Sequence, residues 1–187
     1  MPRLPMARDF VYFDLETQKS ANDVGGWGRK DLMKMSIGVT YSTRLGAYRI
    51  FGEEDADDLV DQLRRADLVI GFNHIYFDYE VLQAYTVLNL KEEIPSFDLM
   101  VDLEEKIGHR PKLEAVAQPT LGVGKTAEGT QAIRWWREGK ILEIARYCAF
   151  DVKVTKEVHE YGAEYGLVRY TNRFKQLQEV AVEWPVP

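Results

Sequence analysis

The sequence predicts an α/β domain with a central mixed sheet flanked by helices. Short apolar and aromatic runs with strand composition occupy the first half, and the first of them spans residues 10–15. Segments of helical period separate these runs, and the second half is mostly helical. This alternation is typical of α/β folds. Since neither an internal repeat nor a linker divides the 187 residues, we expect one domain over 1–187.

Strands are expected first in chain order because β-formers cluster there. Residues 10–15 read FVYFDL, an apolar run that ends in acid, which suits a buried strand. A glycine-containing loop is expected over 18–30. Two strands joined by a turn are expected next, and the fully apolar LVIGF predicts an interior strand. These three strands are expected over 35–41, 47–51 and 68–72.

Helices are expected wherever apolar residues recur at i, i+3 and i+4. Leu59, Val60 and Leu63 share one face of a predicted helix. In the last helix, Gly162 and Gly166 predict a break near its end. A short strand is expected over 96–100, and a terminal hairpin over 167–170 and 180–184. The predicted helices cover residues 55–66, 77–88, 113–117, 131–137 and 140–165.

Composition excludes several classes of protein. Lysine and arginine number 24 against 30 acids, so the net charge of −6 excludes a wholly basic nucleic-acid wrapper. One cysteine and three histidines exclude an intrachain disulfide and a Cys/His zinc cage. No secretory signal is expected, and no run approaches the roughly 18 apolar residues of a membrane span. We therefore expect a soluble, cytoplasmic protein without a membrane partner.

Acids at the ends of apolar elements are the informative feature. Asp14 and Glu16 are two residues apart, so both carboxylates project from one face of the first strand. Two like charges on a buried strand need a compensating positive charge, and oxygen ligands suit magnesium or manganese. The alternative is a frayed strand end with two solvated acids.

Two further acids stand at places where site residues gather. Asp78 follows the strand LVIGF, and active groups in open α/β sheets lie beyond the carboxyl ends of strands. Helix capping is the alternative for this residue. Tyr147 and Asp151 are four apart and share one helical face. The alternative there is a surface aspartate with a packed tyrosine beside it.

Three fragments in this order resemble the DEDD superfamily of 3′–5′ exonucleases, which have a three-layer ribonuclease H-like fold. FDLET (13–17) looks like the first motif, and GFNHIYFDYEVL (71–82) like the second, with Asn73 and Asp78 at the matching positions. YCAFD (147–151) looks like the third, in the form of the tyrosine subclass. The resemblance spans about 9–161 and leaves 162–187 as a C-terminal extension. Gly25-Gly26-Trp27 and Trp135-Trp136 look closest to a bacterial, helicase-associated branch.

The resemblance implies an activity and a set of catalytic residues. Asp14, Glu16, Asp78 and Asp151 would hold two divalent cations, Mg²⁺ or Mn²⁺, with Asp14 bridging them. Tyr147 would orient the attacking water. The implied reaction is hydrolysis of phosphodiester bonds at the 3′ end of single-stranded DNA or RNA, which releases nucleoside 5′-monophosphates.

Residues expected to contact the substrate lie in or beside the first two motifs. Trp27 either stacks a terminal base or packs at the edge of the core. No dense basic run is present, which suggests either short single strands as substrate or delivery of the strand by a partner such as a helicase or polymerase. The alternatives are a noncatalytic interaction module and a structure-specific endonuclease on the same fold. The expected substrate contacts are Leu15, Thr17, Trp27, Asn73, His74 and Phe77. The candidate phosphate contacts are Arg29, Lys30, Lys112, Lys125, Arg134 and Arg137. His109 and His159 are expected at the surface, and Cys148 in helix packing.

Overall fold

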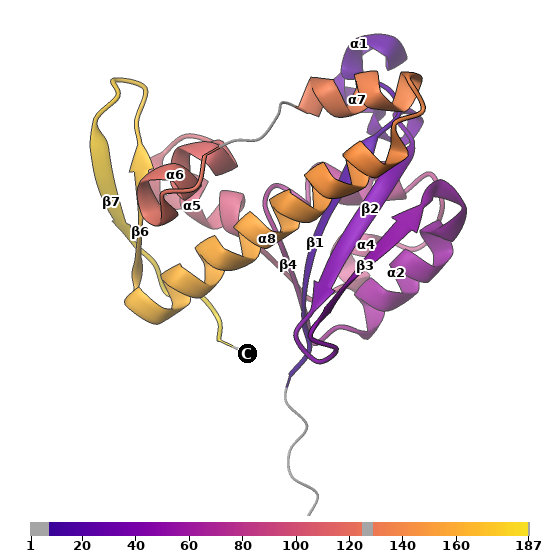
Figure 1. The fold of residues 1–187 in the computed structure, drawn as a ribbon. Helices are drawn as coiled ribbons and strands as arrows, with labels where there is room; N and C mark the ends of the chain where they lie inside the picture. The colour runs from indigo at the N-terminus through magenta and orange to yellow at the C-terminus, as the bar shows by residue number, and fades with distance from the viewer. Residues whose placement is uncertain (1–7, 125–128, 187) are drawn as a thin grey trace, which may run out of the picture.

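The computed structural model describes residues 8–124 and 129–186 and has the expected α/β architecture (Figure 1). The strands are β1 (Phe10–Thr17), β2 (Met35–Ser42), β3 (Ala47–Gly52), β4 (Leu68–Gly71), β5 (Ser96–Asp98), β6 (Leu167–Thr171) and β7 (Leu177–Ala181). The helices are α1 (Ala21–Val24), α2 (Ala56–Arg65), α3 (Asp78–Leu82), α4 (Leu90–Glu93), α5 (Leu99–Ile107), α6 (Leu113–Leu121), α7 (Gly129–Arg137) and α8 (Ile141–Tyr165).

The main sheet is mixed and has β1 in its centre. Its strand order is β3-β2-β1-β4-β5. β2 is antiparallel to β1 and β3, whereas β1, β4 and β5 are parallel. The carboxyl ends of β1 and β4 therefore lie at the same edge, where the second predicted motif begins.

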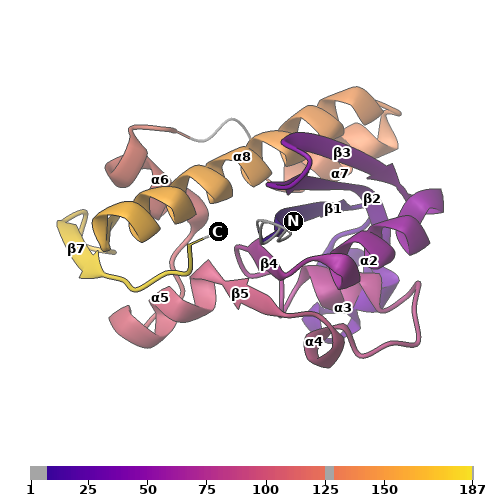
Figure 2. The same cartoon turned by 90° about the horizontal axis from the view of Figure 1, so that it is seen from below.

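Helices cover both faces of this sheet (Figure 2). Alternate residues of β1 enter two different cores because side chains of a strand alternate between its faces. Phe10 and Tyr12 pack in one core with α6 and α8. Val11, Phe13 and Leu15 pack in the other with α2 and α3. The strand is buried on both faces up to the residues that carry the predicted site.

The predicted break in the last helix is wrong, because α8 runs unbroken from Ile141 to Tyr165. Gly162 lies inside the helix, where the Trp184 ring occupies the space that a Cβ atom would need. Gly166, at φ 69°, ends the helix in the left-handed conformation. The glycine at 162 thus serves packing against the C-terminal segment.

Other differences concern segments where side-chain capping decides the structure. The predicted loop over 18–30 contains α1, which begins with a capping box between Ser20 and Asp23, and a 3₁₀ segment, Trp27–Leu32. Asp98 ends β5 and caps α5 through the N–H groups of Met100 and Val101, so an unpredicted helix follows the strand directly. The helix predicted over 77–88 ends at Leu82, and α4 was not predicted.

The C-terminal hairpin is confirmed, but its second strand, β7, covers Leu177–Ala181 and not the predicted 180–184. β6 pairs with β7 and contacts α6 and α8, while β7 contacts α5. Beyond the hairpin, the indole N–H of Trp184 donates to Asp102 at 2.7 Å. Among the described helices, none combines the length and apolar composition of a membrane span.

Candidate metal centre

The first two site acids continue the face of β1 that points toward α8. Asp14 and Glu16 follow Phe10 and Tyr12 at the same period of two, whereas Leu15 between them enters the opposite core. Both carboxylates are half-buried. The strand therefore presents a pair of acids to the one helix that carries the third predicted motif.

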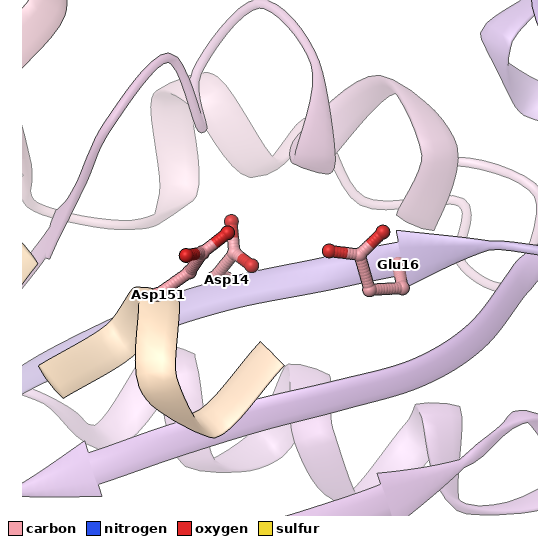
Figure 3. A group of neighbouring side chains, drawn as sticks. All are labelled: Asp14, Glu16 and Asp151. Carbon is pink, nitrogen blue, oxygen red and sulfur yellow. The ribbon is translucent and has the colours of Figure 1, made fainter. Parts of the chain in front are cut away.

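Asp151 completes a group of three carboxylates (Figure 3). One oxygen from each of Asp14, Glu16 and Asp151 lies within 4.8 Å of the others. Tyr147, one helical turn before Asp151, shares a side-chain hydrogen bond with it. The spacing of four residues thus brings phenol and carboxylate to the same place, as expected for a helix.

Asp78 lies beside this group but is held by the backbone. It begins α3, is 2% exposed, and accepts the N–H of Leu15 at 2.9 Å. That hydrogen bond fixes its carboxylate at β1 between the two acids of the strand. The predicted four-acid set therefore consists of three converging carboxylates and a fourth anchored next to them.

The carboxylates repel one another, and a bound cation would relieve that repulsion. Burial, and then the negative charges of Asp78, Glu16 and Asp151, raise the pKa of Asp14 well above its usual range. Burial, and then Asp151 and Asp78, do the same for the pKa of Glu16. Among residues 8–124 and 129–186, no lysine or arginine forms an ion pair with Asp14, Glu16 or Asp78. These hard oxygen donors fit Mg²⁺ or Mn²⁺.

Cys148 is a contact of this site that sequence reasoning assigned to packing alone. It is fully buried, and its thiol donates to the backbone oxygen of Asp14 at 3.3 Å, with the Oδ2 atom at 3.5 Å. Burial, and then the negative charge of Asp14, raise the pKa of the thiol, which keeps it a donor. Its place after Tyr147 gave no signal, because the contact depends on how α8 crosses β1.

A cleft of about 580 Å³ opens beside the acids and contains most of the expected substrate contacts. Its floor carries Asp14, Glu16 and Asp78, and its walls come from α1 and α7. A second hollow of about 160 Å³ is lined by Tyr147 and Asp151. The expected contacts that line the cleft are Leu15, Thr17, Trp27, Asn73 and Phe77.

Trp27 lies at the surface, so packing at the core edge is the wrong alternative. Its side chain is 67% exposed, and its ring meets that of Phe77 edge-on at 6.4 Å between centroids. The two rings form an aromatic edge on a cleft whose floor is acidic. Such an edge offers a face on which a base can stack.

His74 does not line the cleft. It has no exposed surface, its ring contacts Tyr79, and its Nδ1 atom lies 3.4 Å from an oxygen of Asp98. Burial lowers its pKa to about 4, so the ring is neutral near pH 7. Its neighbour Asn73 does line the cleft, at φ 65°, and donates its N–H to Asp98 at 2.7 Å. His74 thus supports the loop from behind, and the expectation that it contacts substrate is revised.

His159 is also not at the surface. It is fully buried on α8, and its Nδ1 atom shares a hydrogen bond with the hydroxyl of Tyr12 at 2.9 Å. Its ring stacks on Trp184, 6.0 Å away and 10° from parallel. His109 is exposed as expected.

The candidate phosphate contacts include residues that pair with an acid and residues that form no ion pair with a described residue. Lys112 lines both hollows, and neither it nor Arg29 forms an ion pair with a described residue. Lys125 lies outside the described residues. The other three candidates pair with acids, as Lys30 with Glu80, Arg134 with Glu138 and Arg137 with Asp23.

Comparison with known proteins places this sequence in a family. A sequence model of the RNase_H superfamily matches residues 11–162. A search of curated proteins finds no match. Among solved structures, the chain resembles a family B DNA polymerase from the hyperthermophilic archaeon Pyrobaculum calidifontis, with a TM-score of 0.64 and 16% identity. The likeness covers 88% of this chain and 26% of the polymerase, so the chain spans about a quarter of that protein. At this identity the likeness concerns the fold alone.

Proposed function

The chain belongs to the RNase_H superfamily, and from that premise we propose that it is a metal-dependent 3′–5′ exonuclease of the tyrosine DEDD subclass. Its substrate is the 3′ end of single-stranded DNA or RNA, and its products are nucleoside 5′-monophosphates. The observation that carries the proposal is the convergence of Asp14, Glu16 and Asp151 within 4.8 Å, beside Asp78.

Each acid of the proposed site has a role that its position supports. Asp14, Glu16, Asp78 and Asp151 would hold two divalent cations, with Asp14 as the shared ligand. Such cations, when bound, lower the pKa of a coordinated water and stabilise the attacking and leaving oxygens of a phosphodiester. The Leu15 N–H holds the Asp78 carboxylate, and the Cys148 thiol anchors the backbone oxygen of Asp14.

Tyr147 would orient the attacking water through its hydroxyl. Burial, and then the negative charge of Asp151, raise the pKa of this phenol, so it acts as a hydrogen-bond donor and not as a base. Trp27 and Phe77 would stack the terminal base. Leu15, Thr17 and Asn73 would contact the last nucleotides from the cleft walls.

Within residues 8–124 and 129–186, Arg29 and Lys112 are the candidate phosphate contacts without an ion pair to a described residue, which supports delivery of the strand by another protein. Affinity for polynucleotides comes largely from lysine and arginine on phosphates, and three of the candidate cations pair with acids. A helicase or a polymerase would hold the strand and present its 3′ end.

The test is cleavage of 5′-labelled single-stranded DNA and RNA with Mg²⁺, Mn²⁺ or EDTA. We expect a ladder that shortens from the 3′ end, is lost in EDTA and is lost in Asp14→Asn. Asp61→Asn is the matched control, because this acid lies on α2, paired with Arg65, outside the cleft. Retained cleavage by Asp14→Asn would refute the site. Internal cuts would favour the endonuclease, and intact substrate without metal binding in calorimetry would favour the noncatalytic module.

A further inference from the structure

An ion pair joins the two walls of the cleft. Asp23 belongs to α1, directly after β1, and Arg137 is the last residue of α7. The Nη2 atom of Arg137 donates to the Oδ2 atom of Asp23 at 2.9 Å, although 114 residues separate them. In Figure 1 the two helices lie together at one end of the molecule. The contact therefore connects α1, which follows the strand of the first motif, with α7, which precedes the helix of the third motif.

The position of Arg137 on its helix directs it to the cleft. Thr130 and Ile133 on α7 line the cleft, and Arg137 follows them at i+7 and i+4 on the same helical face. On the opposite wall Asn22 lines the cleft and Asp23 is the next residue. The ion pair thus lies beside the cleft and joins the two helices that supply these lining residues.

A competing anion can replace Asp23 as the partner of Arg137 in this ion pair. The side chains of Arg137 and Asp23 are 61% and 35% exposed, and exposed ion pairs stabilise little and are screened by salt. Asp23 also accepts the N–H and hydroxyl of Ser20, at 2.8 and 2.7 Å. Loss of Arg137 therefore leaves the aspartate with partners. The planar guanidinium group in turn matches two oxygens of a phosphate.

We propose that the Asp23–Arg137 pair is a latch across the cleft, which a phosphate of the bound single strand opens by taking Arg137 from Asp23. The inference rests on the proposed function, since it requires a polynucleotide in the cleft. Arg137 then contributes to strand binding, whereas Asp23 competes with the strand. The two partners of one ion pair must therefore have opposite effects on affinity. A pair that only clamps the walls together would give both variants the same effect.

The test is fluorescence anisotropy of a 5′-labelled single-stranded DNA, titrated with protein at several salt concentrations. All proteins carry Asp14→Asn, which keeps the strand intact. We expect Arg137→Gln to weaken binding about threefold at 0.2 M salt and to reduce the slope of log affinity against log salt by about 0.7, the value for one phosphate on a single strand. Arg137→Lys retains the slope. Asp23→Asn strengthens binding, and its side-chain oxygen still accepts the N–H of Ser20, the N-cap of α1.

The matched control is Arg65→Gln, which removes another exposed arginine from an ion pair, on α2. Its affinity and slope are expected to follow those of the reference protein. Equal weakening by Arg137→Gln and Asp23→Asn, or an unchanged slope in Arg137→Gln, would overturn the latch while 3′-end cleavage by the wild-type protein still stood. Absence of strand binding by the reference protein would also overturn it. Absence of cleavage by the wild type would instead refute the proposed function.

Discussion

Replacing Asp14 by asparagine is expected to stabilise the metal-free protein while it abolishes metal binding. In the wild type, carboxylate oxygens of Asp14, Glu16 and Asp151 lie within 4.8 Å of one another. Two unit charges at that distance repel by about 3 kcal/mol at an effective dielectric constant of about 20, and by about 1 kcal/mol if water screens them fully. Asparagine keeps the shape and removes the charge.

The expected gain is therefore about 1–3 kcal/mol, or a rise in Tm of about 2–10 °C for a chain of this size. Thermal unfolding in EDTA near pH 8 measures it. Addition of Mn²⁺ should raise the Tm of the wild type and leave that of Asp14→Asn unchanged. Asp61→Asn, on the exposed face of α2, should show neither effect.

The same charges give the metal-free protein a characteristic pH dependence. Burial raises the pKa values of Asp14, Glu16 and Asp78 above their usual values in the folded state. Nearby negative charges add to the rise, from the other site acids for Asp14 and Glu16 and from Asp98 for Asp78. As pH rises past those usual values, near 4, the unfolded chain releases protons that the folded chain retains, so stability falls with pH. Chemical denaturation in EDTA between pH 5 and 8 should show this fall, and Asp14→Asn should flatten it. A wild type whose stability rises over that range, or an Asp14→Asn protein less stable in EDTA, would refute the reasoning.

Three further substitutions separate chemistry, binding and packing. Tyr147→Phe should lower kcat by about 10²-fold with unchanged metal affinity in calorimetry, because it removes the hydroxyl that we propose orients the water; an unchanged kcat would contradict that role. Trp27→Ala should raise the KM for single strands by an amount worth about 1–3 kcal/mol of lost stacking, with kcat and Tm retained since the ring is exposed; a fall in Tm alone would make it a structural residue. Gly162→Ala should destabilise by about 1–3 kcal/mol in urea, because its Cβ would meet the Trp184 ring. The double variant with Trp184→Ala should lose less than the two single costs combined, and strict additivity would contradict the packing role.

The site could be predicted as far as local periodicity reaches. A period of two puts Asp14 and Glu16 on one face of β1, and a period of four puts Tyr147 beside Asp151. Both patterns hold in the structure, as does the start of α3 at Asp78. These predictions need no knowledge of how the elements cross.

Features that depend on the crossing of distant elements could not be predicted. Cys148 looked like ordinary helix packing, yet it contacts Asp14 because α8 crosses β1 there. His74 was expected to contact the substrate and His159 to lie at the surface, but tertiary packing buries both. The helix α5 was not predicted because a strand and the next helix are usually separated by a loop. Here Asp98 ends β5, and its side chain caps α5 directly.

Because α8 is unbroken, contacts near its C-terminal end affect the position of Asp151. Asp151 lies eleven residues before Gly162, where Trp184 is seated, which is about 16 Å along a helix axis. A rigid rod that tilts by about 5° at the Trp184 contact moves Asp151 by about 1.4 Å, and a misplacement of about 1 Å can reduce a rate about 10²-fold. Packing of Trp184 on α8 therefore helps to fix Asp151 relative to the other carboxylates, although the described C-terminal residues contribute no group to them.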